Sequence, residues 1–264
     1  MRCLTICSTA LLLAISSFSS LADTETEKEQ AKELSPYSVS FFKRQVASTN
    51  SVEHAIRSLL ARYPEKTTQF AEVAFATYPE KYKEIISASV IAQPMYVDEI
   101  IKVANEYKVS DPADIVSIAI SAEPSYAEVA TKAACKYSPD HFEEIVKTAV
   151  QSEPDSADQI AQKLVTAYPN RTMEILVTTI KEVPYVGNYI LDALLAVVQE
   201  DEEKSQELII TSMEQLADYP KAVERLVQLA HQHQVDAQLV KESAIKGGLS
   251  ETEIVALIDQ HYQD

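Results

Sequence analysis

Residues 63–70 read YPEKTTQF, and residues 78–85 read YPEKYKEI, so the same four letters recur fifteen residues apart. Prolines continue this spacing along the chain, at positions 64, 79, 94, 124, 139, 154, 169 and 184. Every interval is fifteen positions except a single doubled one, in which Val109 stands at the skipped mark and Pro112 follows. Self-similarity at a fixed period indicates a repeat protein, whereas a catalytic motif would not need copies.

Apolar residues follow the same period. With each proline counted as position 1, positions 4, 7, 8, 11 and 12 form the pattern of one apolar face of an α-helix. Position 7 shows it most clearly, with Phe70, Ile85, Ile100, Ile115, Ala130, Ile145, Ile160, Ile175 and Ile190. Proline is favoured in the first helical turn and forces the preceding residue out of the α region. Each proline is therefore expected to end one helix and begin the next.

Each unit has room for about 12 helical residues and a connection of two or three residues. Such short connections make neighbouring helices antiparallel. One such helix cannot bury its apolar face alone, so the units must stack. Tyrosines close every second unit, which favours a repeat of two helices. We predict an all-α fold: a right-handed-type α-solenoid of antiparallel helical hairpins, with a fifteen-residue unit for each helix and a thirty-residue unit for each two-helix repeat.

The chain divides into five parts by composition and register. They are a signal peptide (1–22), a polar segment with room for a first helix (23–48), a helical repeat domain (49–198), a register break that contains a helix (199–219) and a C-terminal helical cap (220–264). The break is placed after Val198 because Pro220 falls six residues beyond the expected mark. In the cap, Gly247 and Gly248 should end one helix. Ser250 and Glu253 form the capping-box pattern of a last helix, expected from Ile254 to about His261.

The first 22 residues have the features of a secretory signal. Arg2 supplies a positive charge, an apolar stretch follows, and Ser20-Leu21-Ala22 resembles a cleavage site. A retained membrane anchor is the alternative, but the apolar stretch is short for a span of about 20 residues. We expect cleavage before Asp23, no membrane span afterwards, and an exported protein that is periplasmic or, alternatively, extracellular.

Composition narrows the range of functions. The formal net charge of −17 disfavours a nucleic-acid partner. Only three glycines are present, and no phosphate-binding loop or hydrolase motif is found. Cys135 occupies core position 12 and is expected to be a buried thiol rather than a nucleophile. His231 and His233 do not share a helix face. We therefore predict no catalytic residue, no cofactor and no metal site.

Two sets of residues repeat with the two-helix unit without belonging to the predicted core. The first, called here the tyrosine row, consists of Tyr78, Tyr107, Tyr137 and Tyr168. The second, called here the acidic row, occupies position 6 of alternate helices and consists of Glu84, Asp114, Glu144 and Glu174. Tyrosines can hold a peptide or a sugar, or they can plug helix junctions. Acids can bind a basic partner or Ca²⁺, or they can form a solvated flank.

Extended repeat surfaces serve binding more directly than chemistry. We expect an exported, non-enzymatic helical-repeat protein that binds a protein or a polysaccharide as a scaffold or adaptor. The alternative is an enzyme or small-ligand receptor whose site lies in residues 199–264.

Overall fold

The structure is a computed structural model that describes residues 34–262. The predicted signal peptide and its cleavage site lie outside the described residues. Between residues 34 and 262 the secondary structure is helical, without strands. None of the helices in this range is long and apolar enough to cross a membrane.

Fifteen α-helices and eight short 3₁₀ turns make up the described part of the chain. The α-helices are α1 (Pro36–Thr49), α2 (Val52–Arg62), α3 (Thr67–Thr77), α4 (Tyr82–Ala92), α5 (Val97–Glu106), α6 (Pro112–Ala122), α7 (Ala127–Tyr137), α8 (Phe142–Ser152), α9 (Ala157–Ala167), α10 (Thr172–Glu182), α11 (Gly187–Val198), α12 (Glu202–Gln215), α13 (Pro220–Gln232), α14 (Ala237–Lys246) and α15 (Glu251–His261). The 3₁₀ turns are η1 (Pro64–Lys66), η2 (Pro79–Lys81), η3 (Pro94–Tyr96), η4 (Pro124–Tyr126), η5 (Pro139–His141), η6 (Pro154–Ser156), η7 (Pro169–Arg171) and η8 (Pro184–Val186).

The fifteen-residue period is the spacing of helix starts. From α2 to α12, each α-helix begins fifteen positions after the one before it. The repeating proline opens a 3₁₀ turn rather than the α-helix itself, so the α-helix begins at position 4 instead of position 1. The residue before the proline leaves the α region as expected: Tyr78, for example, has φ −138° and ψ 60°.

Three helix starts in this series lack the proline turn and use side-chain caps instead. Ser51, Asp111 and Asp201 each accept a hydrogen bond from a backbone N–H in the first turn of α2, α6 and α12. At the skipped proline mark, Lys108 takes a left-handed conformation with φ 49°. Asp111 then caps α6, which begins at Pro112, fifteen positions after the start of α5. The fifteen-residue spacing of helix starts is thus maintained in two ways, by a 3₁₀ turn that begins with proline or by a capping side chain.

The spacing of helix starts changes between α12 and α13. α12 begins at Glu202, in phase with α11 at Gly187, and the spacing first changes at α13, which begins at Pro220 instead of at position 217. The count of prolines gives a six-residue offset because Pro220 is itself the first residue of an α-helix, without a preceding 3₁₀ turn. The shift is therefore three residues, not six. The capping box at Ser250 and Glu253 is formed, and α15 begins at Glu251, earlier than expected.

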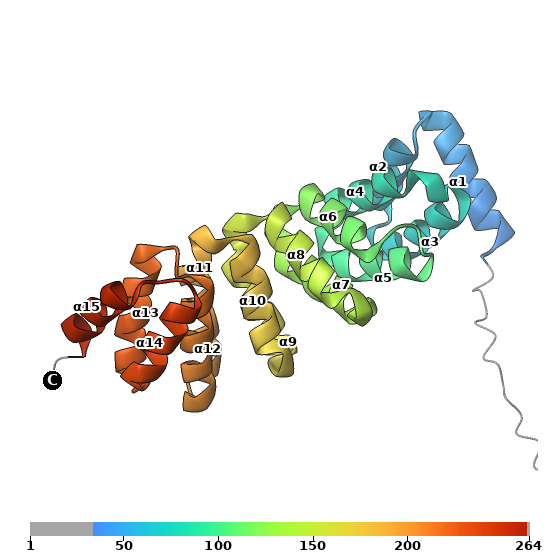
Figure 1. Cartoon of the computed structure of the whole chain (residues 1–264). Coiled ribbons are helices and arrows are strands. Elements are labelled where there is room, and N and C mark those ends of the chain that lie inside the picture. The colour runs from blue at the N-terminus through green and yellow to red at the C-terminus, as the bar shows by residue number, and fades with distance from the viewer. Residues whose placement is uncertain (1–33, 263–264) are drawn as a thin grey trace, which may run out of the picture. The chain divides into compact units, whose positions relative to one another are not determined.

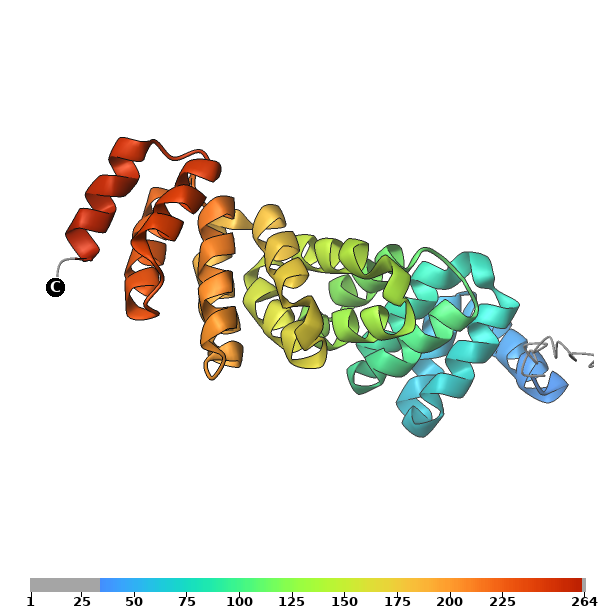
Figure 2. The same cartoon turned by 60° about the horizontal axis from the view of Figure 1, so that its bottom comes forward.

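Each α-helix packs against the next helix along the chain and against the next but one. Each even-numbered helix contacts the next even-numbered helix, and each odd-numbered helix contacts the next odd-numbered helix. The colours from α1 to α15 follow the helices in chain order (Figures 1 and 2). The predicted core faces lie between these helices: positions 7, 8 and 11 of the repeats are buried throughout, apart from Phe70 in the first proline-marked unit. Phe70 is half-buried and packs against Tyr63 at a ring distance of 6.4 Å. The chain is therefore a helical-repeat protein.

Candidate functional site

The acidic row lies on α4, α6, α8 and α10, all even-numbered helices. Three of its members pair with the residue three positions earlier, at the end of the preceding 3₁₀ turn. Lys81 Nζ lies 2.8 Å from Glu84 Oε1. Arg171 Nε and Nη2 donate to the two oxygens of Glu174 at 2.7 and 2.6 Å. His141 Nδ1 lies 3.5 Å from Glu144 Oε2. The row is thus less negative than its sequence implied, since Lys81 and Arg171 offset the charge of two of its acids.

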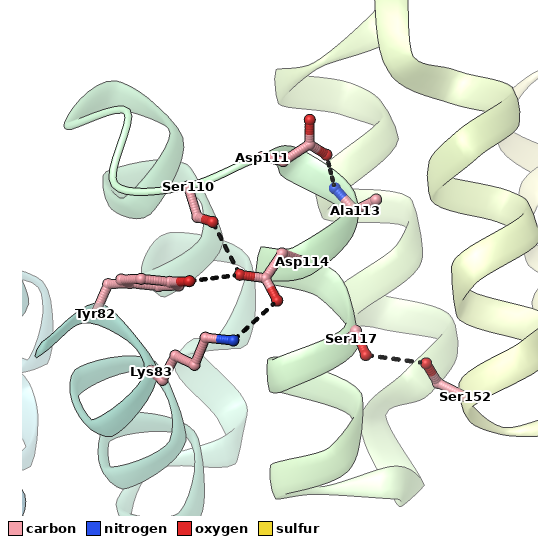
Figure 3. Close-up of polar contacts among 8 residues, drawn as sticks. All are labelled: Tyr82, Lys83, Ser110, Asp111, Ala113, Asp114, Ser117 and Ser152. Atoms are coloured by element: carbon pink, nitrogen blue, oxygen red, sulfur yellow. Dashed lines mark hydrogen bonds and ion pairs between the residues drawn. The ribbon is translucent and has the colours of Figure 1, made fainter. Parts of the chain in front are cut away.

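Asp114, the fourth member of the acidic row, is held by residues of α4 and of the loop before α6 (Figure 3). The hydroxyl groups of Tyr82 and Ser110 both donate to Asp114 Oδ2 at 2.8 Å, and Lys83 Nζ lies 3.6 Å from Oδ1. Burial by itself raises the pKa of this carboxyl. The hydrogen bonds from Tyr82 and Ser110, together with the charge of Lys83, outweigh burial and hold the pKa below its ordinary value. Asp114 is thus a fixed anion that joins α4 to α6.

The next contact along the even-numbered helices is weaker. Ser117 on α6 and Ser152 on α8 share a hydrogen bond of 3.2 Å, also drawn in Figure 3. Further on, Glu182 on α10 accepts a hydrogen bond from Gln151 and pairs with Lys147 of α8 at 3.1 Å. Polar side chains therefore tie successive even-numbered helices together outside the apolar core.

The tyrosine row lies at the C-terminal ends of α3, α5, α7 and α9, all odd-numbered helices. Its four side chains are half-buried and pack against the core. The rings of Tyr78, Tyr107 and Tyr168 lie 6.1, 6.4 and 5.4 Å from a phenylalanine ring each. The three phenylalanines are Phe42, Phe75 and Phe142. These contacts fill the junctions between repeats, which is the structural interpretation of the row.

Tyr137 makes polar contacts instead. Its hydroxyl group donates to Asp98 Oδ1 at 2.6 Å, and Lys136 Nζ lies 2.8 Å from the same hydroxyl oxygen. Burial, followed by the hydrogen bond to Asp98, raises the pKa of Tyr137 above its ordinary value. Each of the four tyrosine side chains is therefore partly buried against neighbouring helices and partly exposed to solvent.

Hollows on the described surface are open and of moderate size. One of about 290 Å³ lies where α10 meets α12, and it is lined in part by Thr172, Asp201 and Lys204. Another of about 510 Å³ lies at the start of α8, beside His141 and Glu144. A third, of about 290 Å³, lies between α1 and α3 and is lined by aromatic rings, among them Tyr37.

No family model, curated protein or solved structure matches this chain. Function must therefore be inferred from the geometry of these surfaces.

The residues that the sequence assigned to ordinary structural roles occupy such positions. Cys135 is buried and free, and burial raises the pKa of its thiol to about 12, so the thiolate nucleophile is suppressed. The ring of His231 lies 4.9 Å from that of Tyr262. His233 Nδ1 instead lies 3.3 Å from Glu202 Oε1, so the two histidines contact different neighbours.

Sequence reasoning missed one cluster. Asp111, His141 and Glu144 bring one potential ligand atom each to within 4.8 Å of one another. Asp111 and His141 both occupy position 3 of their units and are one two-helix repeat apart, which is the sequence signal that could have pointed to the cluster.

Proposed function

We propose that this chain is an exported, non-enzymatic helical-repeat protein that binds a protein or polysaccharide partner as a scaffold. In finer detail, its repeat domain is a right-handed α-solenoid of antiparallel helical hairpins with a thirty-residue unit. The proposed location is the periplasm, with the extracellular space as the alternative.

One observation carries the proposal: the contacts between helices repeat at the length of the two-helix unit. The side-chain hydrogen bonds that connect separate helices join residues 27 to 39 positions apart, for example Tyr82 to Asp114 and Ser138 to Asn105. Equivalent positions of successive units therefore lie next to each other. A side chain that recurs once in every two-helix unit forms a row on the surface, and a row suits an extended partner better than a small substrate.

The two rows differ in how much of their side-chain surface is exposed to a partner. The tyrosines are half-buried between helices, whereas the side chain of Glu144 is 58% exposed. Exposed charges are screened over about 8–10 Å at physiological ionic strength, so an acidic contact weakens as salt rises. An aromatic contact is nearly independent of salt. The acidic row is therefore the stronger candidate for a basic partner, and the tyrosine row for a sugar or peptide.

The proposal is tested with the full chain immobilised and exposed to a cell-envelope extract, followed by cross-linking and mass spectrometry. Cross-links concentrated on the even- or odd-numbered helices between residues 49 and 198 support binding by the repeats. The contact is then assigned with Glu144→Lys/Glu174→Lys against Tyr107→Ala/Tyr137→Ala across a salt series. If both double variants bind like the wild type, the proposed rows are not the binding surface.

The second candidate is a small-ligand or catalytic site in residues 199–264. The hollow between α10 and α12 favours it, because Asp201 and Lys204 line this hollow and lie 3.0 Å from each other. Cross-links confined to this end of the chain, together with loss of binding in Lys204→Ala, support that candidate over the first.

A further inference from the structure

The three side chains of Asp111, His141 and Glu144 come from the starts of two even-numbered helices. Asp111 is the N-cap residue of α6, His141 ends the 3₁₀ turn before α8, and Glu144 lies in the first turn of α8. One nitrogen or oxygen atom of each lies within 4.8 Å of the corresponding atoms of the other two. All three side chains are exposed, so a solute reaches them without any opening of the core.

The two-helix repeat explains why they meet. α6 and α8 are neighbours, and the Ser117–Ser152 hydrogen bond connects them. Asp111 and His141 hold the same position in their units, each immediately before an α-helix. The backbone amide of Ala113 uses one carboxylate oxygen of Asp111 for the helix cap. This bond holds the carboxyl group at the start of α6, where one of its oxygens lies within 4.8 Å of a ligand atom of both His141 and Glu144.

The charges around this cluster set it apart from the rest of the acidic row. Glu84, Asp114 and Glu174 are each paired with a lysine or an arginine. Among the described residues, Glu144 instead faces His141, whose imidazole nitrogen can also bind a metal ion. Asp140 and Glu143 line the adjoining hollow, and Lys147 in the same hollow pairs with Glu182. In the described part of the chain, a lysine or arginine thus pairs with each of the other three acids, whereas the ion-pair partner of Glu144 is a histidine.

We propose that Asp111, His141 and Glu144 bind a divalent transition-metal ion, with Zn²⁺ as the best match. An imidazole nitrogen with two carboxylates suits Zn²⁺, whereas Ca²⁺ and Mg²⁺ prefer oxygen ligands alone. Three protein ligands leave a fourth tetrahedral position for water or for a group from another molecule. The metal supplies the positive charge that Lys81 and Arg171 supply elsewhere in the row. This site departs from the expectation of no metal drawn from the sequence, and it stands whether or not the repeats bind a partner.

The test is calorimetric titration of the full chain with ZnCl₂ near pH 7.5. We expect one saturable Zn²⁺ site that His141→Gln, Asp111→Asn and Glu144→Gln each weaken by roughly tenfold or more, because loss of even a supporting residue of a metal site costs about 10–100-fold. Circular dichroism checks that each variant keeps its helical content. X-ray absorption of the zinc-loaded chain should show a single imidazole ligand.

Matched controls separate this site from diffuse attraction to an acidic protein. His231→Gln removes an exposed histidine elsewhere, and Glu84→Gln removes the equivalent acid of another repeat, so both should bind Zn²⁺ like the wild type. Mg²⁺ should bind at least about tenfold more weakly, because it is a poor match for imidazole. The proposal is overturned if no saturable Zn²⁺ site appears, if His141→Gln binds like the wild type, or if Mg²⁺ binds equally well.

Discussion

Tyr137 donates its hydroxyl hydrogen to Asp98 Oδ1 at 2.6 Å, and the two residues lie 39 positions apart in the chain. Tyr137 ends α7 and Asp98 belongs to the first turn of α5, so the bond joins two odd-numbered helices. Lys136 Nζ lies 3.7 Å from the same carboxylate oxygen. A residue singled out as a candidate contact for a partner is thus also a connection between repeats.

This connection predicts a measurable coupling. Tyr137→Phe and Asp98→Asn should each destabilise the chain in urea unfolding, and a double-mutant cycle should give a coupling of about 1 kcal/mol, typical of one hydrogen bond. Phenylalanine keeps the ring, so the packing of Tyr137 is preserved. A coupling of zero would show that the bond does not stabilise the folded chain.

The assignment of core positions predicts that substitutions at a buried and at an exposed position differ in their effect on the free energy of unfolding. Ile145 on α8 is fully buried, so Ile145→Asp places a charge among apolar side chains and should cost roughly 3–5 kcal/mol or unfold the neighbouring repeats. Lys132→Asp on α7 changes an exposed side chain and should alter the free energy of unfolding by less than about 1 kcal/mol. Similar losses of thermal stability in the two variants would contradict the assigned helix phase.

Cys135 predicts a pH-dependent loss of stability. Burial raises its pKa from 9.0 to about 12 in the folded chain, so its thiol stays neutral where the unfolded chain ionises. A raised folded pKa gives a contribution that is complete below pH 9 and is lost as the pH rises toward 12. Between pH 8 and pH 10.5 the wild type should lose more stability than Cys135→Ala, by roughly 2 kcal/mol at about 1.4 kcal/mol per pH unit.

Urea unfolding of both proteins at the two pH values measures this difference, and the other titrating groups cancel in the comparison. Alkylation gives an independent check. The peptide that contains Cys135 should react slowly with iodoacetamide in the folded chain and readily after unfolding. Equal rates in the two states would show that the thiol is not protected.

The network around Asp114 predicts the opposite pH effect. Its pKa is held below the ordinary value of 3.8, so its contribution to stability is present above that pH and is lost as the pH falls through the lower folded pKa. Tyr82→Phe removes one hydrogen bond and should raise the pKa of Asp114, which a carboxyl NMR titration measures. Tyr185→Phe is the control, because Tyr185 is 65% exposed; an equal pKa change in both variants would exclude a specific role for Tyr82.

The close approach of α14 to α12 predicts that Gly247 cannot be enlarged without cost. A Cβ atom at Gly247 would lie 2.7 Å from the backbone oxygen of Glu214, which cannot move alone. Gly247→Ala should therefore destabilise the chain by about 1–3 kcal/mol, as overpacking does. At Gly187 the nearest atoms belong to the end of the Leu216 side chain, so Gly187→Ala is the milder control. Equal effects of the two substitutions on the melting temperature would show that the contact with the Glu214 backbone does not limit the size of residue 247.

Much of the fold could be predicted from local pattern. The spacing of prolines and the apolar positions identified the helices, their core faces and the burial of Cys135, because helix boundaries and amphipathic faces depend on residues only a few positions apart. The sequence was misleading where one residue type serves two local structures. Proline opens a 3₁₀ turn at position 64 and an α-helix at position 220, so the offset at Pro220 is six residues when prolines are counted but three when helix starts are counted.

The candidate sites needed the tertiary structure, because their chemistry depends on which repeat faces which. The sequence by itself determined that Glu84, Asp114, Glu144 and Glu174 recur on alternate helices. Only the structure decided that three of them pair with lysine or arginine and that Glu144 lies beside His141 and Asp111. The physical reason is range: a helix is specified by neighbours along the chain, whereas the charge around a carboxylate is also set by side chains of the adjoining repeat, far away in the sequence.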